Sequence, residues 1–266
     1  TWNTTKKNIL KISSKEELAN NSILYFSEMI ADYNEGNILT SLIVKSSEST
    51  DTNLLTIRGA IKDNISLEPL KKVWAVLYIK GHKNDSILWN QKPDYISKTD
   101  ENGFFNFPNL QDTNYVLFAL HDKDQNLQYS LKEERVGFHD GIIRPNKDSI
   151  TILLFSEFDK LDSITPLKND SLKEFGSLSL DSLPLNSVFE LILNDKTILR
   201  KFNTDSVFID SLPPNKYKAR IFIDKNKNKS WDAGTLFNRI LPEPIEYYPK
   251  EINIRSNWEV NINWPK

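Results

Sequence analysis

The residues best suited to chemistry in this sequence are oxygen-bearing side chains near its C-terminal end. In the segment 224–234 (DKNKNKSWDAG), every second residue from Asp224 to Asp232 carries a side-chain oxygen. A tight loop directs alternate side chains towards one centre, and Ca²⁺ prefers a shell of several oxygen ligands. The spacing therefore predicts a weak calcium site with Asp224, Asn226, Asn228 and Asp232 as ligands, and we expect no other cofactor.

A structural interpretation of the same loop is favoured. Aspartate and asparagine side chains in polar hairpin loops commonly accept hydrogen bonds from their own backbone. The loop lacks the glycine and the bidentate glutamate of an EF-hand, and three interspersed lysines dilute its negative charge. A second oxygen-rich cluster follows an apolar run earlier in the chain, and with fewer ligands we interpret it as an ordinary loop. It consists of His121, Asp122, Asp124 and Asn126.

The sequence contains no arrangement typical of catalysis. It has no cysteine, and its histidines, His82, His121 and His139, are scattered. Motifs for a serine nucleophile, a zinc protease, a phosphate-binding loop or a dinucleotide site are absent. Two histidines precede an aspartate, but neighbours on a strand point to opposite faces. Carboxylate pairs are abundant by chance among 36 acidic residues, so no pair is singled out for a hydrolase.

Aromatic side chains are the other candidates for binding. Trp89 and Tyr95 lie in a polar connection, and Trp231 lies within the acidic loop. Exposed rings are typical of carbohydrate platforms and of protein interfaces. Trp258 and Trp264 fall at even-numbered positions, like the apolar residues around them, which predicts that both are packed in the core.

Alternation of apolar and polar residues predicts β-strands along most of the chain. Within residues 252–264 the apolar side chains all fall at even positions, as in a strand with one face on a core. Runs at 73–79, 115–120 and 150–155 are apolar on both faces, which indicates central strands. Helical periodicity is confined to residues 13–19. We therefore expect an all-β chain of tandem antiparallel β-sandwich domains.

Two polar segments divide the chain. Residues 45–53 have almost no apolar side chains, and residues 159–174 combine charges and a proline without alternation. The predicted parts are therefore residues 1–50, 54–158 and 175–266. The second and third have a normal domain size, whereas the first has too few strands for a sandwich of its own.

Several segments, in this order, resemble surface lipoproteins of the phylum Bacteroidota. ILYFSEMIADYNEGNIL resembles the end of the bacterial Ig-like domain that opens many of those proteins. The segments at 55–63, 92–110 and 115–129 are similar to their transthyretin-like or carboxypeptidase-regulatory-like β-sandwich, and 212–234 and 247–264 to their C-terminal unit. The resemblance implies an Ig-like remnant at 1–50, a transthyretin-like sandwich at 54–158 and a further β-sandwich at 175–266.

The resemblance also implies export and a lipid anchor. The chain begins at Thr1 and shows neither a signal peptide nor a lipid-bearing cysteine. We interpret it as a fragment whose anchor lies upstream. The expected location is the outer membrane, on the cell surface or on the periplasmic face. No apolar run is long enough for a membrane-spanning helix. A formal net charge of −2 with interspersed charges argues against a nucleic-acid surface, which requires a basic stripe.

Together these observations predict a non-catalytic structural or accessory subunit. Its partners would be outer-membrane proteins, in a complex for barrel assembly, secretion or nutrient uptake. The alternative is a carbohydrate-binding module of a surface glycan system, favoured by the fold and the aromatic candidates. A hydrolase is a second alternative that no motif supports.

Overall fold

The computed structural model describes residues 55–79, 87–146, 148–167, 174–202 and 205–265, together with the backbone of short strands within residues 1–50. Apart from the short helix α1 (Ile87–Asn90), the regular secondary structure of the described residues consists of β-strands, which confirms the all-β fold class. The chain forms two compact units: residues 1–62 with 68–154, and residues 63–67 with 155–266. No described helix has the length and apolar composition to cross a bilayer. The predicted helical turn at 13–19 lies outside the described residues.

The described backbone of residues 1–50 contains three two-stranded antiparallel ladders. β1 pairs with β2, β3 with β6, and β4 with β5. The assignment of this part to an Ig-like remnant stays a prediction. The strands are β1 (Trp2–Lys6), β2 (Ile9–Ile12), β3 (Ile23–Phe26), β4 (Ile30–Ala31), β5 (Ile38–Leu39) and β6 (Leu42–Lys45).

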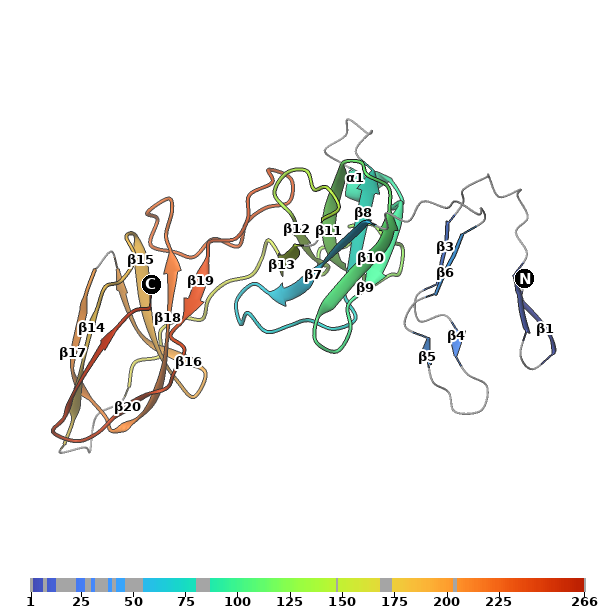
Figure 1. Cartoon of the computed structure of the whole chain (residues 1–266). Coiled ribbons are helices and arrows are strands. Elements are labelled where there is room, and N and C mark those ends of the chain that lie inside the picture. The colour runs from blue at the N-terminus through green and yellow to red at the C-terminus, as the bar shows by residue number, and fades with distance from the viewer. Residues whose placement is uncertain are drawn as a thin grey trace. The chain divides into compact units, whose positions relative to one another are not determined.

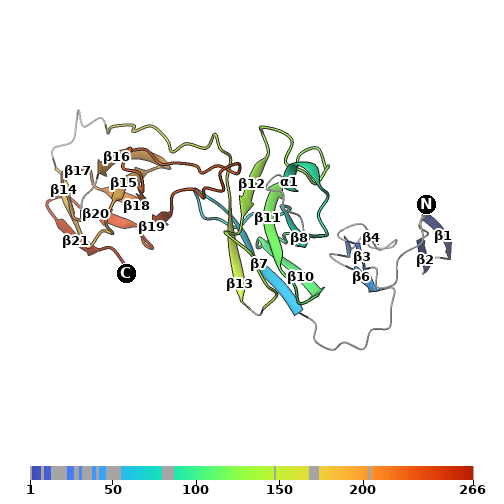
Figure 2. The same cartoon turned by 90° about the horizontal axis from the view of Figure 1, so that it is seen from above.

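The first unit contains a β-sandwich of two sheets (Figures 1 and 2). One sheet has the strand order β10-β7-β13 and the other β12-β11-β8-β9. β8 and β11 are central and buried, as predicted, whereas the run at 150–155 forms an edge strand with alternating burial. The elements are β7 (Leu55–Asp63), β8 (Trp74–Ile79), α1 (Ile87–Asn90), β9 (Tyr95–Lys98), β10 (Phe104–Leu110), β11 (Tyr115–His121), β12 (Arg135–Phe138) and β13 (Ser149–Leu154).

The second unit is a sandwich of the same kind. Its sheets have the orders β17-β14-β21 and β16-β15-β18-β19, and β20 also pairs with β18. β14 and β21 run parallel, whereas the other pairs of this unit are antiparallel. The strands are β14 (Gly176–Asp181), β15 (Ser187–Leu193), β16 (Lys196–Phe202), β17 (Val207–Leu212), β18 (Asn215–Ile223), β19 (Ile245–Tyr247), β20 (Ile252–Ile254) and β21 (Glu259–Asn263).

The C-terminal alternation is interrupted at one point. Ile252, Ile254 and Trp264 are buried, as the parity predicted, but Trp258 is 65% exposed. A turn separates β20 from β21, and within it Asn257 has a φ of 58°. Trp258 lies at the end of this turn, before β21 begins, so the alternation of a strand does not set the direction of its side chain. The core assignment of Trp258 is therefore wrong.

The two sandwiches repeat one strand order. The sheet β10-β7-β13 corresponds to β17-β14-β21, and β12-β11-β8-β9 corresponds to β19-β18-β15-β16. In both, a tyrosine of the central strand (Tyr115 or Tyr217) donates its hydroxyl hydrogen bond to the carbonyl oxygen four residues earlier, at 3.1 and 2.7 Å, forming a tyrosine corner. Burial raises the pKa of Tyr217 to about 12. Both sandwiches also have a bulge at a left-handed residue, Asn109 or Ser211.

The outer faces of the two larger sheets differ. In the first sandwich, α1 lies against this face, and the Tyr78 hydroxyl donates to the carbonyl oxygen of Gln91 at 3.3 Å. In the second, the connector 159–167 crosses it, and the amide of Thr165 donates to the carbonyl oxygen of Thr197 at 2.8 Å. Three register-equivalent positions are apolar in the first sandwich and charged in the second: Val76, Ile96 and Phe118 against Glu190, Arg200 and Arg220.

Candidate functional site

Each sandwich carries an acidic loop at the same place, directly after its central strand. Asp122 follows β11 and Asp224 follows β18. The Asp122 carboxylate accepts hydrogen bonds from the backbone N–H groups of Asn126 and Leu127, at 3.2 and 2.8 Å. The Asp224 carboxylate accepts from the N–H groups four and five positions later, at 3.1 and 2.9 Å. The two loops therefore share one hydrogen-bonding arrangement, and we name them the Asp122 loop and the Asp224 loop.

A buried glutamate closes each loop. Glu134 and Glu243 stand just before β12 and β19, and both are buried. An oxygen of Glu134 accepts from the N–H of the residue after Asp122 at 3.1 Å, and an oxygen of Glu243 does the same after Asp224 at 2.7 Å. Sequence reasoning missed both glutamates, because they are distant along the chain. The pairing of β12 with β11 and of β19 with β18 brings them in.

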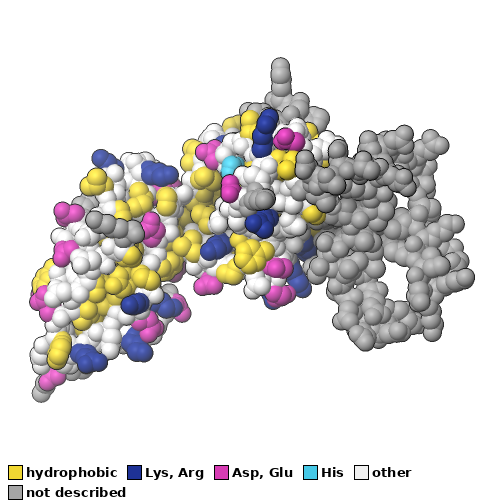
Figure 3. Space-filling view, in the orientation of Figure 1, with side chains coloured by type: hydrophobic (Ala, Val, Ile, Leu, Met, Phe, Trp, Pro, Cys, Tyr) yellow, Lys and Arg dark blue, Asp and Glu magenta, His cyan; other side chains and the backbone are white. Residues whose placement is uncertain are grey.

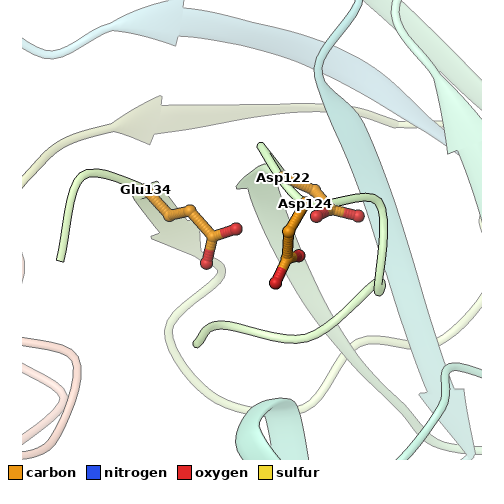
Figure 4. Close-up of side chains that lie close together, drawn as sticks. All are labelled: Asp122, Asp124 and Glu134. Carbon is orange, nitrogen blue, oxygen red and sulfur yellow. The ribbon is translucent and has the colours of Figure 1, made fainter. Parts of the chain in front are cut away.

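The Asp122 loop gathers three carboxylates. Oxygens of Asp122, Asp124 and Glu134 lie within 4.8 Å of one another, and Figure 4 shows these side chains converging from two segments. Burial raises the pKa of Asp122, and the neighbouring carboxyl of Asp124 adds to the rise, while backbone N–H donors oppose it. A site of this kind suits a hard cation such as Ca²⁺, whose charge would offset the crowding.

The Asp224 loop brings together all four residues predicted as ligands. The side-chain amides of Asn226 and Asn228 donate to Asp232, at 2.6 and 3.0 Å. The Asn228 side-chain oxygen accepts from the backbone N–H of Ser230 at 2.7 Å. These are the contacts that the hairpin-turn interpretation predicts. Calcium binding at this loop stays a prediction.

Carboxylates also crowd each other in the Asp224 loop. Burial raises the pKa of Glu243, and the charges of Asp232 and Asp224 raise it further, while the N–H groups of Lys225 and Asp232 oppose the rise. An ionised Glu243 is therefore less favourable here than in water. A bound cation would offset the repulsion between the carboxylates of Glu243, Asp232 and Asp224.

The aromatic candidates do not form one exposed surface. Trp89, half-buried in α1, packs edge-to-face against Tyr129 with ring centroids 6.2 Å apart. Tyr95 packs similarly against Tyr115 at 6.0 Å. Trp231 is only 7% exposed, and its indole N–H donates to the carbonyl oxygen of Glu243 at 2.8 Å. Its ring therefore anchors the Asp224 loop and is not free to stack on a sugar.

The second sandwich has an apolar insertion next to its acidic loop. Glu134 follows Asp122 by twelve residues, whereas Glu243 follows Asp224 by nineteen. The longer connection contains residues 235–241 (TLFNRIL), which we name the apolar loop.

The apolar loop is fixed at its base. Thr235 and Ile240 exchange backbone hydrogen bonds of 2.8 and 2.9 Å, and the amide of the buried Leu236 donates to Glu157 at 2.8 Å. Phe237 is nevertheless 83% exposed, Ile240 53% and Leu241 39%. Figure 3 shows that hydrophobic side chains are prominent on the surface of this unit. Sequence reasoning missed this loop, because its apolar residues have no strand periodicity.

Comparisons with known proteins give weak structural similarity. No family model matches the chain, and no curated protein matches it. A streptococcal ancillary pilin has a TM-score of 0.26 at 10% identity, over 92% of this chain and 76% of the pilin. A DUF3823 family protein from Parabacteroides merdae has 0.25 at 11%, over 76% and 98%. A fimbrial assembly protein from Parabacteroides distasonis has 0.23 at 10%, over 79% and 92%. Scores of this size carry no argument about function.

Proposed function

We propose that this chain is the β-sandwich part of an exported, non-catalytic protein that serves as a structural or accessory subunit of an outer-membrane protein complex. The observation that carries the proposal is the apolar loop of the second sandwich. Hydrogen bonds fix the base of this loop, yet its Phe237 and Ile240 side chains are exposed to solvent. Apolar side chains on a rigid, protruding loop gain free energy when a partner buries them, at about 25 cal/mol per Å².

The loop has the features of a protein-binding anchor. Interfaces commonly depend on a few large side chains that enter pockets of the partner, and aromatic residues are enriched among them. A fixed loop loses little conformational freedom on binding, which favours affinity. The same position of the first sandwich has the shorter connection, so the insertion is additional to the shared scaffold. Insertions on a repeated scaffold are a common place for function.

The outer-membrane location and the upstream lipid anchor rest on the resemblance to Bacteroidota surface lipoproteins. Under this proposal the anchor places the chain at the membrane, and the apolar loop contacts a protein of the complex.

The test is co-purification from detergent-solubilised outer membranes of the organism that encodes the chain. The wild-type protein should recover an outer-membrane barrel protein, and the Phe237→Ser/Ile240→Ser variant should lose it. The matched control is Phe208→Ser, which alters an exposed aromatic side chain on β17. Equal recovery by the loop variant and the wild type would refute the role of the loop. A monomer that instead binds surface glycans would favour the carbohydrate-binding alternative.

A further inference from the structure

The Asp224 loop presents three lysines at its surface. They occupy alternate positions, Lys225, Lys227 and Lys229, and all three are exposed. Within the described part of the chain, their ammonium groups have no hydrogen-bond or ion-pair partner. We name these three residues the lysine rim. A group of neighbouring cations without counter-charges is a surface that an anionic ligand can bind.

The carboxylates of the loop are engaged by other donors. Asp224 is fully buried, and its carboxylate accepts from the backbone N–H groups four and five positions later. The buried Glu243 accepts from the N–H groups of Lys225 and Asp232, at 2.7 and 3.2 Å. Asp232 accepts from two asparagine side-chain amides. The two buried carboxylates therefore lie inside the loop, whereas the positive charges lie at its surface.

The backbone of the loop does not require lysine at these positions. Lys227 and Lys229 have left-handed φ values of 60° and 66°, a conformation that asparagine and glycine adopt more readily. At the equivalent positions of the Asp122 loop, Gln125 and Leu127 have φ values of 61° and 59°. The same loop conformation thus accommodates an amide, an apolar or a cationic side chain. Lysine at both positions distinguishes the second sandwich and is not explained by the shared scaffold.

The lysine rim and the apolar loop belong to the same connection, between β18 and β19. The amide of Glu243 donates to the carbonyl oxygen of Asp232 at 3.0 Å, and Thr235 and Ile240 exchange hydrogen bonds at the base of the apolar loop. Thr235 follows Asp232 by three positions, a chain length of at most about 11 Å. The cationic loop and the exposed apolar loop therefore adjoin. Lysines beside exposed apolar side chains are typical of surfaces at a membrane interface.

We propose that the lysine rim binds the phosphate groups of anionic lipids, so that the second sandwich itself contacts the membrane surface. A lysine ammonium binds phosphate oxygens as a point charge and from any direction, whereas a defined carboxylate on a protein is commonly recognised by the planar fork of arginine. The rim consists of lysines alone. A layer of lipid phosphates suits such a rim, because it offers many acceptors without a fixed geometry.

The size of the effect follows from the number of cations. Each lysine close to an anionic membrane surface strengthens association about fivefold, so three together contribute about 100-fold. Charges more than about 8 Å from the surface are screened at physiological salt, so lysines elsewhere on the chain contribute little. This inference goes beyond the proposed function, because it assigns a lipid headgroup to residues outside the apolar loop.

Flotation of the purified full chain with lipid vesicles tests the proposal. One set of vesicles contains phosphatidylcholine with about one quarter phosphatidylglycerol, and the other contains phosphatidylcholine alone. The wild type should bind the anionic vesicles only, and less as the salt concentration rises. The Lys225→Gln/Lys227→Gln/Lys229→Gln variant should bind them about 100-fold more weakly. An unchanged melting temperature checks that this variant folds, which we expect because the Asp122 loop has glutamine at one of these positions.

The matched control removes the same charge elsewhere. Lys132→Gln/Lys160→Gln/Lys250→Gln alters three exposed lysines outside the rim, and it should bind within about twofold of the wild type. The proposal is overturned if the rim variant and this control bind equally, or if the wild type binds phosphatidylcholine as strongly as the anionic vesicles. It is also overturned if inorganic phosphate displaces the chain more than sodium chloride of equal ionic strength does, because the site would then be one for free phosphate.

The apolar loop is tested in the same assay. Phe237→Ser/Ile240→Ser should bind the anionic vesicles as the wild type does, because the proposed function assigns this loop to a protein. Loss of vesicle binding by this variant, with binding retained by the rim variant, would mean apolar insertion and would overturn the role of the lysines. The vesicles contain no protein, so the result is independent of co-purification with an outer-membrane complex.

Discussion

Glu190→Gln removes a carboxylate that two arginines share in the second sandwich. Glu190 is fully buried on β15, and the side-chain Nε atoms of Arg200 and Arg220 donate to its two oxygens at 2.6 Å each. Arg220 also donates to the hydroxyl of Tyr247 at 3.1 Å. Burial lowers the pKa of Arg220, but the Glu190 carboxylate and the Tyr247 hydroxyl together raise it more, so that the pKa of Arg220 is raised overall. Without the carboxylate, a buried guanidinium loses its counter-charge.

The size of the effect follows from this geometry. Breaking a buried ion pair by removing one partner costs about 3–5 kcal/mol, because the remaining charge stays desolvated. Replacing the whole set by apolar residues is different, and is often neutral or stabilising by about 1–4 kcal/mol. The first sandwich provides the replacements, since its register-equivalent residues are valine, isoleucine and phenylalanine. The Glu190→Val/Arg200→Ile/Arg220→Phe variant should therefore be at least as stable as the wild type.

Native-state hydrogen exchange of the backbone amides of β15 and β18 measures these changes in the full chain, because it reports the opening free energy of those strands. Glu190→Gln should lower that free energy by about 3–5 kcal/mol, and the triple variant should restore it. The control is Lys218→Gln, at an exposed position on β18, which should change it little. If Glu190→Gln costs less than about 1 kcal/mol, or if the triple variant is as unstable as the single one, the reasoning is refuted.

Three further predictions concern the acidic loops and the C-terminus. If Asp224 helps to bind calcium with the weak affinity of extracellular modules, about 10⁻⁴–10⁻³ M, then 1–10 mM calcium should stabilise the second sandwich by about 0.4–2.7 kcal/mol. Magnesium should stabilise it little, and calcium should not stabilise the Asp224→Ala variant. A melting temperature that calcium leaves unchanged would exclude the site. The pKa of Asp122 is raised on folding, so the folded protein binds a proton at this carboxylate more readily than the unfolded chain does. The stability of the first sandwich should therefore rise as pH falls from neutrality towards the ordinary carboxyl range. Thermal melts across pH measure this rise, which Asp124→Asn should weaken. Trp258→Ala should cost less than about 1 kcal/mol in denaturant titrations, against about 3–5 kcal/mol for the buried Trp264→Ala, and equal losses would contradict the exposure of Trp258.

The strands could be predicted from the sequence because their signal is local. Apolar residues at 217, 219, 221 and 223 alternate with the polar Lys218 and Arg220, which predicts β18, and the apolar runs predict β8 and β11. Alternation also marked Arg220 as facing away from the sandwich core, which is correct. It could not show that this face is covered, since the cover comes from the connector at 159–167, far away in sequence. Glu190 and Arg200 meet Arg220 only through strand pairing, so no spacing in the sequence marks the three as a set.

The acidic loops illustrate the same limit. Asp122 and Asp224 could be identified because their oxygen-bearing neighbours follow at every second position. Glu134 and Glu243 could not, since the lengths of the two connections differ and only the common register of the strands aligns them. The sequence also suggested that Trp231 was available for binding. Its burial follows from the long connection folding back, with Glu243 accepting its hydrogen bond.

The differences between the two sandwiches bear on function more than their similarities do. The strand order, the tyrosine corner and the acidic loop are present in both, so each can be explained by the requirements of the scaffold. The ion pairs of Glu190 and the apolar loop belong to the second sandwich. Buried charges add little stability compared with apolar packing, but they require one arrangement of the chain around them. The Arg200 guanidinium also donates to the carbonyl oxygen of Asp162 at 3.3 Å, so the same ion pairs hold the connector in register. The second sandwich therefore combines a fixed covering segment with an exposed apolar loop, and under the proposed function this loop is the surface that a partner would contact.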